Sequence, residues 1–222
     1  MIDTSRRVFT LALYCVVCVS LASAEGFRQH KVWFPVGPNP SAIAAVDLNG
    51  NGLPEIISAD TGALTDPRSE RPANNELSVL AASKPLEYEK QVPLITGFGP
   101  YCLAIANIDA LPALDILVGS FHTVERRSES RDLTLFRNIG DLLFEPVSFS
   151  VPLDRLQYLR NRDADEQPIF TKPGLTSMVV RDFNRDEYRD VIATGWSSDV
   201  LVYFPGHATA YFEEPRFIAA PG

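Results

Sequence analysis

The sequence predicts an all-β fold, a β-propeller built from four-stranded antiparallel blades. Three observations lead to this prediction: a stretch that recurs three times along the chain, short apolar runs that alternate with polar loops, and many turn-forming residues. The chain of 222 residues contains 17 Pro and 13 Gly, which are costly inside long helices. Its 45% hydrophobic and 22% charged residues are typical of a globular protein. The net charge of −8 argues against nucleic acid as a partner.

The recurring stretch consists of an apolar strand, a polar loop and a second apolar strand. It aligns without gaps at three places, whose loops are 47–55, 107–115 and 182–190, here called loops A, B and C. Two more apolar runs follow each loop, so each unit is expected to hold four short strands. The predicted blades cover about 41–96, 100–153 and 174–219 within one domain, 25–222, and 154–173 form a polar insertion.

Neighbouring blades are expected to pack against each other, because one four-stranded sheet cannot cover both of its own faces. This stacking predicts that apolar strand residues are buried between blades, namely Ile43, Ile57, Leu103, Ile116, Val179 and Ile192. The alternative is a two-layer sandwich in which the similarity of the three units is accidental.

The segment from His30 to Val36 resembles the fourth strand of a preceding blade. The prediction is therefore three blades plus one extra N-terminal strand. Closed propellers have 4–8 blades, so the ring is expected to be incomplete, with open blade edges that favour self-association. Either the chain is a portion of a longer propeller or a second copy completes its ring.

The first 24 residues are typical of a secretory signal peptide. Arg6 and Arg7 precede an uncharged apolar run, 8–21, and Ala22 and Ala24 supply the small residues before a cleavage site. The apolar run is shorter than the ~20 residues needed to span a bilayer. We therefore expect a secreted or periplasmic protein without a membrane span after cleavage. Cys102 is then the last remaining cysteine, and its apolar surroundings predict a core residue rather than a nucleophile.

Loop A has oxygen-bearing side chains at alternate positions, which can converge on one centre. A hard cation such as Ca²⁺ takes 6–8 oxygen ligands. Glycines at 50 and 52 permit the positive φ angles that a tight turn requires. The expected ligands in loop A are the side chains of Asp47, Asn49, Asn51 and Glu55 and the carbonyl group of Leu53.

Loop C offers one more carboxylate but lacks the glycines, since Arg185 and Glu187 occupy their positions. Its expected ligands are the side chains of Asp182, Asn184, Asp186 and Asp190 and the carbonyl group of Tyr188. Loop B keeps Asn107, Asp109 and Asp115 but has Leu111 at a ligand position, so weak metal binding or none is expected there. The alternative for all three loops is an Asx-rich hairpin turn without metal.

With these loops the chain resembles the FG-GAP or VCBS repeat family, found in integrin alpha-chain propellers and in many secreted bacterial proteins. The family loop Asp-x-Asn-Gly-Asp-Gly-x-x-Asp matches 47–55 with Asn51 and Glu55 in place of Asp, and matches 182–190 at its ligand positions. Residues 98–99 stand at the family's Phe-Gly, and residues 119–121 at its Gly-Ala-Pro. The resemblance, over about 30–222, implies a Ca²⁺-stabilised propeller often used for adhesion or ligand binding, and implies no single activity.

The sequence predicts a binding module rather than an enzyme. Its histidines, His30, His122 and His207, lie far apart, and no nucleophile elbow, zinc-protease motif or phosphate-binding glycine loop is present. Trp33 and Trp196 are expected to serve packing rather than to stack on sugars. The first hypothesis is a secreted Ca²⁺-binding module whose partner is a protein or a polysaccharide. The alternatives are part of a carbohydrate-active enzyme, such as a polysaccharide lyase, and a structural spacer.

Overall fold

A computed structural model describes residues 33–62, 74–109, 111–121, 131–151, 174–196 and 200–219. The regular structure in these ranges is β-strand, without helix, so the prediction of an all-β fold is confirmed for them. In particular, the described residues contain no helix with the length and hydrophobicity needed to cross a membrane. The chain divides into two compact units, Met1–Trp33 and Phe34–Gly222, and the strands belong to the second. The predicted signal peptide and the insertion 154–173 lie outside the described residues.

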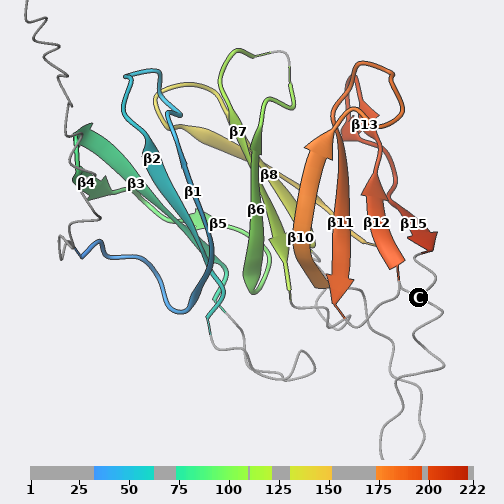
Figure 1. The fold of residues 1–222 in the computed structure, drawn as a ribbon, viewed down its shortest axis with the longest axis horizontal. Helices are drawn as coiled ribbons and strands as arrows, with labels where there is room; N and C mark the ends of the chain where they lie inside the picture. Colours follow the sequence, from blue (N-terminus) through green and yellow to red (C-terminus); the bar gives the residue numbers. More distant parts are fainter. Residues whose placement is uncertain are drawn as a thin grey trace, which may run out of the picture. The chain divides into compact units, whose positions relative to one another are not determined.

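The described strands form three main antiparallel sheets (Figure 1). Sheet 1 has the order β1-β2-β3-β4, with β5 also paired to β3, and consists of Pro40–Val46, Glu55–Asp60, Glu76–Lys84, Glu87–Lys90 and Leu94–Ile95. Sheet 2 has the order β6-β7-β8-β9 and consists of Pro100–Ala106, Asp115–Ser120, Leu133–Asn138 and Phe144–Phe149. Sheet 3 has the order β10-β11-β12-β15 and consists of Gly174–Arg181, Asp190–Trp196, Val200–Phe204 and Arg216–Ala219. A separate hairpin pairs β13, Gly206–His207, with β14, Tyr211–Phe212.

The sequence repeat is also a repeat of strand register. In every sheet the residue before the loop pairs with the last residue of the loop, as Val46 does with Glu55 in sheet 1. The first strand of every sheet also carries a register shift near its start, at equivalent positions. The predicted antiparallel four-stranded units are therefore confirmed, and none of the described sheets closes on itself.

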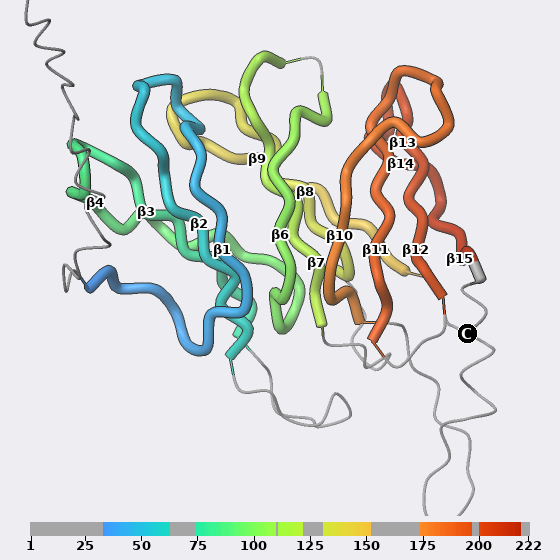
Figure 2. The backbone as a smooth tube through the Cα atoms, in the orientation of Figure 1, coloured from blue at the N-terminus to red at the C-terminus, as the bar shows by residue number. Residues whose placement is uncertain are grey.

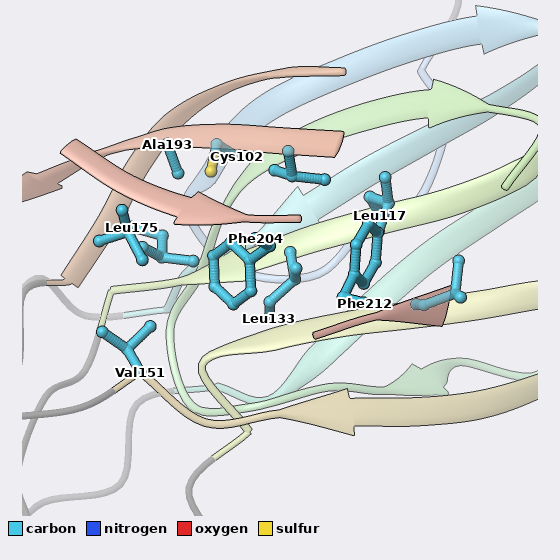
Figure 3. Packing of buried hydrophobic residues seen from close by; sticks show 11 residues of the cluster. Cys102, Leu117, Leu133, Val151, Leu175, Ala193, Phe204 and Phe212 are labelled. Carbon is cyan, nitrogen blue, oxygen red and sulfur yellow. The ribbon is translucent and has the colours of Figure 1, made fainter. Parts of the chain in front are cut away.

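Sheet 2 packs between sheets 1 and 3 through two apolar cores. Strand β6 lies beside both β1 and β10 (Figure 1). Side chains alternate between the faces of a strand, so Ile116 contributes to the core shared with sheet 1 and Leu117 to the core shared with sheet 3. Figure 3 shows this second core, where Cys102 lies among aliphatic side chains and beside Ala193. Cys102 is the buried core residue predicted, and burial raises the pKa of its thiol to about 12.

Polar and aromatic contacts also join the sheets, at the strand ends opposite the loops. The hydroxyl group of Ser41 donates to the carbonyl oxygen of Tyr101 at 2.8 Å, and that of Thr61 donates to the carbonyl oxygen of Pro100 at 2.7 Å. Between sheets 2 and 3, the ring of Phe121 lies 5.4 Å from that of Trp196. Trp196 therefore makes an inter-sheet packing contact, although half of its side chain stays exposed.

Burial between the sheets was predicted correctly for some residues and wrongly for others. Ile57 and Ile116 are fully buried, as expected, and Leu103 is packed against the core between sheets 1 and 2. Ile43 and Val179, by contrast, are 73% and 56% exposed, so their predicted burial is wrong. Alternation along their strands places both side chains on the faces of sheets 1 and 3 that point away from sheet 2.

The predicted extra strand from His30 to Val36 is wrong for the part that is described. Residues 33–37 have no strand pairing, and Trp33 is almost fully exposed rather than packed. Residues 34–37 instead pack on sheet 1: the ring of Phe34 meets that of Tyr88 edge to face at 4.8 Å, and the backbone N–H of Gly37 donates to the carboxylate of Asp60 at 3.0 Å. A side chain at Gly37 would collide with Asp60, which explains the glycine.

Candidate metal-binding loops

Loops A, B and C each connect the first strand of a sheet to its second. Figure 2 shows the three loops at the same end of the sheets, and loop B is described except for Ala110. The shared strand register brings the ends of each loop together, so the oxygen-bearing residues of one loop lie near one another.

In loop A the first residue organises the turn through its carboxylate. Asp47 accepts backbone N–H groups from Gly50 at 2.7 Å, from Asn51 at 3.2 Å and from Gly52 at 2.8 Å. Led by the bond from Gly52, these N–H groups hold the pKa of Asp47 below its ordinary value of 3.8. The loop therefore carries an ionised, solvent-accessible carboxylate at its first position at neutral pH.

The two amide residues of loop A form consecutive Asx turns. The side-chain oxygen of Asn49 accepts the N–H of Asn51 at 3.0 Å, and that of Asn51 accepts the N–H of Leu53 at 2.7 Å. The turns fix the side-chain oxygens within the loop. They also orient the backbone around the carbonyl group of Leu53, the fifth expected ligand.

Loop C adopts the same geometry without glycine. Asp182 accepts N–H groups from Arg185, Asp186 and Glu187 at 2.6, 3.2 and 3.1 Å. Arg185 and Glu187 have φ angles of 66° and 77°, close to the 76° and 83° of Gly50 and Gly52. Loop C thus holds ordinary side chains in left-handed backbone conformations that cost about 1–2 kcal/mol each.

Loop C repeats the Asx turns as well. The side-chain oxygen of Asn184 accepts the N–H of Asp186 at 3.0 Å, and the carboxylate of Asp186 accepts the N–H of Tyr188 at 2.9 Å. Both side chains are exposed. Loops A and C therefore present the same pattern of oxygen atoms, and Asp186 adds a negative charge where loop A has an amide.

The last residue of each loop has a structural role that the sequence did not indicate. Glu55, Asp115 and Asp190 are fully buried, and each accepts the N–H of the second loop residue at 2.8 Å. The other carboxylate oxygen accepts an N–H from the third strand, at 3.4 Å from Ala82 and 2.9 Å from Asn138, or in sheet 3 from the first residue of β13, at 2.6 Å from Gly206. These carboxylates clamp each loop to its sheet. The recurrence of an acidic residue at the start of the second strand was the signal available in the sequence.

Loop B differs from loops A and C in the direction of its hydrogen bonds. The amide group of Asn107 donates to the carbonyl oxygens of Leu111 and Ala113, whereas Asp47 accepts in loop A. Because the carbonyl group of Ala113 corresponds to the expected metal-binding carbonyl of Leu53, this donation competes with metal binding. The structure thus supplies a physical reason to expect weak binding or none in loop B.

A basic side chain occupies the neighbourhood of loop B. Arg137 of β8 forms ion pairs with Asp109 at 3.0 Å and with Glu145 at 2.8 Å, and its guanidinium group lies 5.2 Å from the ring centre of Tyr211. Desolvation opposes the charge of Arg137, but the bond to Asp109 and the surrounding charges outweigh it and raise its pKa. By strand register, Ala81 and Pro205 hold the equivalent places in sheets 1 and 3. Sequence reasoning missed Arg137, although a lone arginine inside an apolar strand was a visible signal.

The donor chemistry of loops A and C suits a hard cation. Carboxylate, amide and carbonyl oxygens are the ligands that Ca²⁺ takes, and no soft ligand is present in either loop. Each carboxylate oxygen can accept more than one bond, so the N–H groups on Asp47 and Asp182 leave acceptor capacity. Among the described residues, however, no three His, Cys, Asp or Glu side chains form a ready metal cluster. A cation would therefore depend on amide, carbonyl and water oxygens in addition to the carboxylates.

A scan against protein-family models and searches of the curated proteins and of the solved structures found no match.

Of the three histidines, the exposed His207 lies in the β13–β14 hairpin, where its ring accepts the N–H of Ala210 at 3.2 Å. His30 and His122 lie outside the described residues.

Proposed function

We propose that this chain is a secreted or periplasmic β-propeller module of the FG-GAP or VCBS type. In this proposal the three sheets are blades, and loops A and C bind Ca²⁺ through the ligands named above. The module then presents a rigid surface to a protein or polysaccharide ligand. The serial packing of the sheets supports the blade assignment, because sheet 2 uses one face for sheet 1 and the other for sheet 3.

The observation that carries the calcium proposal is the shared conformation of loops A and C. Loop C keeps two left-handed residues although neither is glycine. Strained backbone of this kind persists only where the surroundings or a function maintain it. Calcium binding provides such a function, because the strained turn gathers the oxygen atoms of the loop. Calcium would neutralise part of the acidic charge of the loops and stabilise the folded chain by binding it preferentially.

Isothermal titration calorimetry with CaCl₂ tests the proposal. The chain is expected to bind two Ca²⁺ ions, and Asp47→Ala and Asp182→Ala are each expected to remove one. Asp109→Ala in loop B is the matched control and is expected to leave two binding events. No heat of binding, or one unchanged in both loop variants, would refute the assignment of loops A and C.

A further inference from the structure

Two sheet faces carry exposed apolar side chains, although the equivalent positions elsewhere in the chain are packed against a neighbouring sheet. On sheet 3, Val179 is 56% exposed and Ile218 is 40% exposed. On sheet 1, Ile43 is 73% exposed. We call the first surface the trailing face, formed by Val179, Ile192, Leu201, Tyr203 and Ile218. We call the second the leading face, formed by Ile43, Ala45 and Ile56.

The trailing face corresponds to surfaces that cover a neighbouring sheet elsewhere in the chain. In the loop alignment, Ile192 is equivalent to Ile57 of sheet 1 and Leu117 of sheet 2. Ile57 is fully buried in the core between sheets 1 and 2, and Leu117 in the core between sheets 2 and 3. The same strand positions thus form an inter-sheet core twice and are left uncovered on sheet 3.

The leading face is the matching counterpart. Ile43 is equivalent to Leu103 of sheet 2, which packs into the core shared with sheet 1, and to Met178 of sheet 3, which packs into the core shared with sheet 2. Each of these side chains points toward the preceding sheet. Among the described residues no preceding sheet covers the leading face of sheet 1, although residues 34–37 contact side chains of its strands β2, β3 and β4.

We propose that a second copy of this chain covers these faces, with sheet 3 of one copy packed against sheet 1 of the other. One chain presents both halves of an interface that it already forms twice internally, so a second copy repeats an established packing rather than requiring a new one. The contact is head to tail, which allows closed rings as well as open assemblies. Charged residues border the apolar strip of the trailing face, Arg181 at one strand end and Arg216 on the outer strand, as is usual at the rim of an interface.

Size-exclusion chromatography with light scattering tests this proposal, which goes beyond calcium binding. All samples contain CaCl₂, so that loop order is not a variable. The chain is expected to be a dimer or larger at high concentration. Val179→Arg on the trailing face and Ile43→Arg on the leading face are each expected to reduce it to a monomer. Leu143→Arg, also at an exposed apolar residue but in the β8–β9 connection of sheet 2, is the matched control and is expected to leave the mass unchanged.

Mixing the two monomeric variants tests the head-to-tail geometry. Each variant keeps the face that the other has lost, so an equal mixture is expected to regain a dimer with one intact interface. Circular dichroism melts check that the variants are folded. We expect them to fold, because the substituted side chains are exposed. A wild-type chain that remains monomeric from micromolar to millimolar concentration would overturn the proposal. So would an Ile43→Arg variant that stays dimeric, because sheet 3 would then pack on sheet 3.

Discussion

At the scale of single residues, loops A and C form the same turn from different amino acids. Glycine carries no steric penalty at a positive φ angle, whereas Arg185 and Glu187 adopt the same conformation against their preference. The N–H bonds to Asp182 and the clamp formed by Asp190 hold them there. Loop C therefore stores strain that loop A avoids.

Arg185→Gly is expected to stabilise the chain, because it removes this strain without removing a bond that defines the loop. The expected gain is about 1 kcal/mol in the free energy of unfolding, measured by urea denaturation. Gly50→Ala at the equivalent position of loop A is expected to lose a similar amount. A loss of stability in Arg185→Gly would show that the arginine side chain has a role the backbone argument omits.

Two equivalent hydroxyl groups provide a second residue-level prediction. Thr134 in sheet 2 is fully buried and its hydroxyl oxygen has no hydrogen-bond partner among the described residues, whereas Ser78 in sheet 1 donates to Asp60 at 2.6 Å. Thr134→Val is expected to stabilise the chain by about 1 kcal/mol, because a methyl group replaces an unpaired polar group. Ser78→Ala is expected to cost about 1–3 kcal/mol in the same denaturation assay. Equal effects of the two substitutions would contradict this account.

The carboxylate of Asp47 predicts a pH dependence. Its folded-state pKa is lowered, so its contribution to stability is present above the ordinary value of 3.8 and is lost as the pH falls through the lower folded-state value. In metal-free buffer, the difference in melting temperature between the wild type and Asp47→Asn is therefore expected to shrink as the pH falls below 3.8. A difference that grows toward acid pH would assign the opposite sign to this interaction.

At the scale of elements, loops and strands hold one another through buried polar contacts. The amide group of Asn138, at the end of β8, donates to the carbonyl oxygen of Leu48 in loop A at 2.7 Å. Because Leu48 belongs to the loop of the preceding sheet, this bond ties sheet 2 to loop A. The backbone N–H of the same residue donates to Asp115, so Asn138 also takes part in the clamp of loop B.

Asn138→Ala is expected to lower the free energy of unfolding by about 1–3 kcal/mol, because a buried carbonyl group loses its donor. Lys84→Ala, which breaks an exposed ion pair with Glu87, is the control and is expected to change stability by less than about 1 kcal/mol. Thermal or urea denaturation measures both variants. A neutral Asn138→Ala would mean that the inter-sheet bond does not stabilise the fold.

The repeat made the strands and loops predictable, while side-chain roles depended on neighbours from other parts of the chain. The strand–loop–strand pattern around Asp47 and Asp182 fixed the loop positions. The clamp formed by Glu55 was hidden because its second partner, Ala82, lies on another strand. The place of Arg137 beside Asp109 was hidden for the same reason, since only the pairing of β7 with β8 brings the two together.

At the scale of the whole molecule, the sequence predicted stacked sheets but not which faces remain open. Ile43 and Ile57 look alike in the pattern, because both are apolar residues in the first two strands of sheet 1. Their opposite burial follows from the order of the sheets. Ile57 faces sheet 2, whereas Ile43 points to the other side of sheet 1, where no further sheet is described. The periodicity of a single sheet contains no information about that order.

Thermal unfolding in millimolar Ca²⁺ and in EDTA tests the central claim, that the acidic loops bind calcium and thereby stabilise the stacked sheets. At a hundredfold excess of Ca²⁺ over its dissociation constant, each occupied loop is expected to add about 2.7 kcal/mol to the free energy of unfolding. The melting temperature is therefore expected to rise clearly with Ca²⁺, and the double variant Asp47→Ala, Asp182→Ala is expected to lose that rise. Identical melting curves of the wild-type chain in Ca²⁺ and in EDTA would contradict the account.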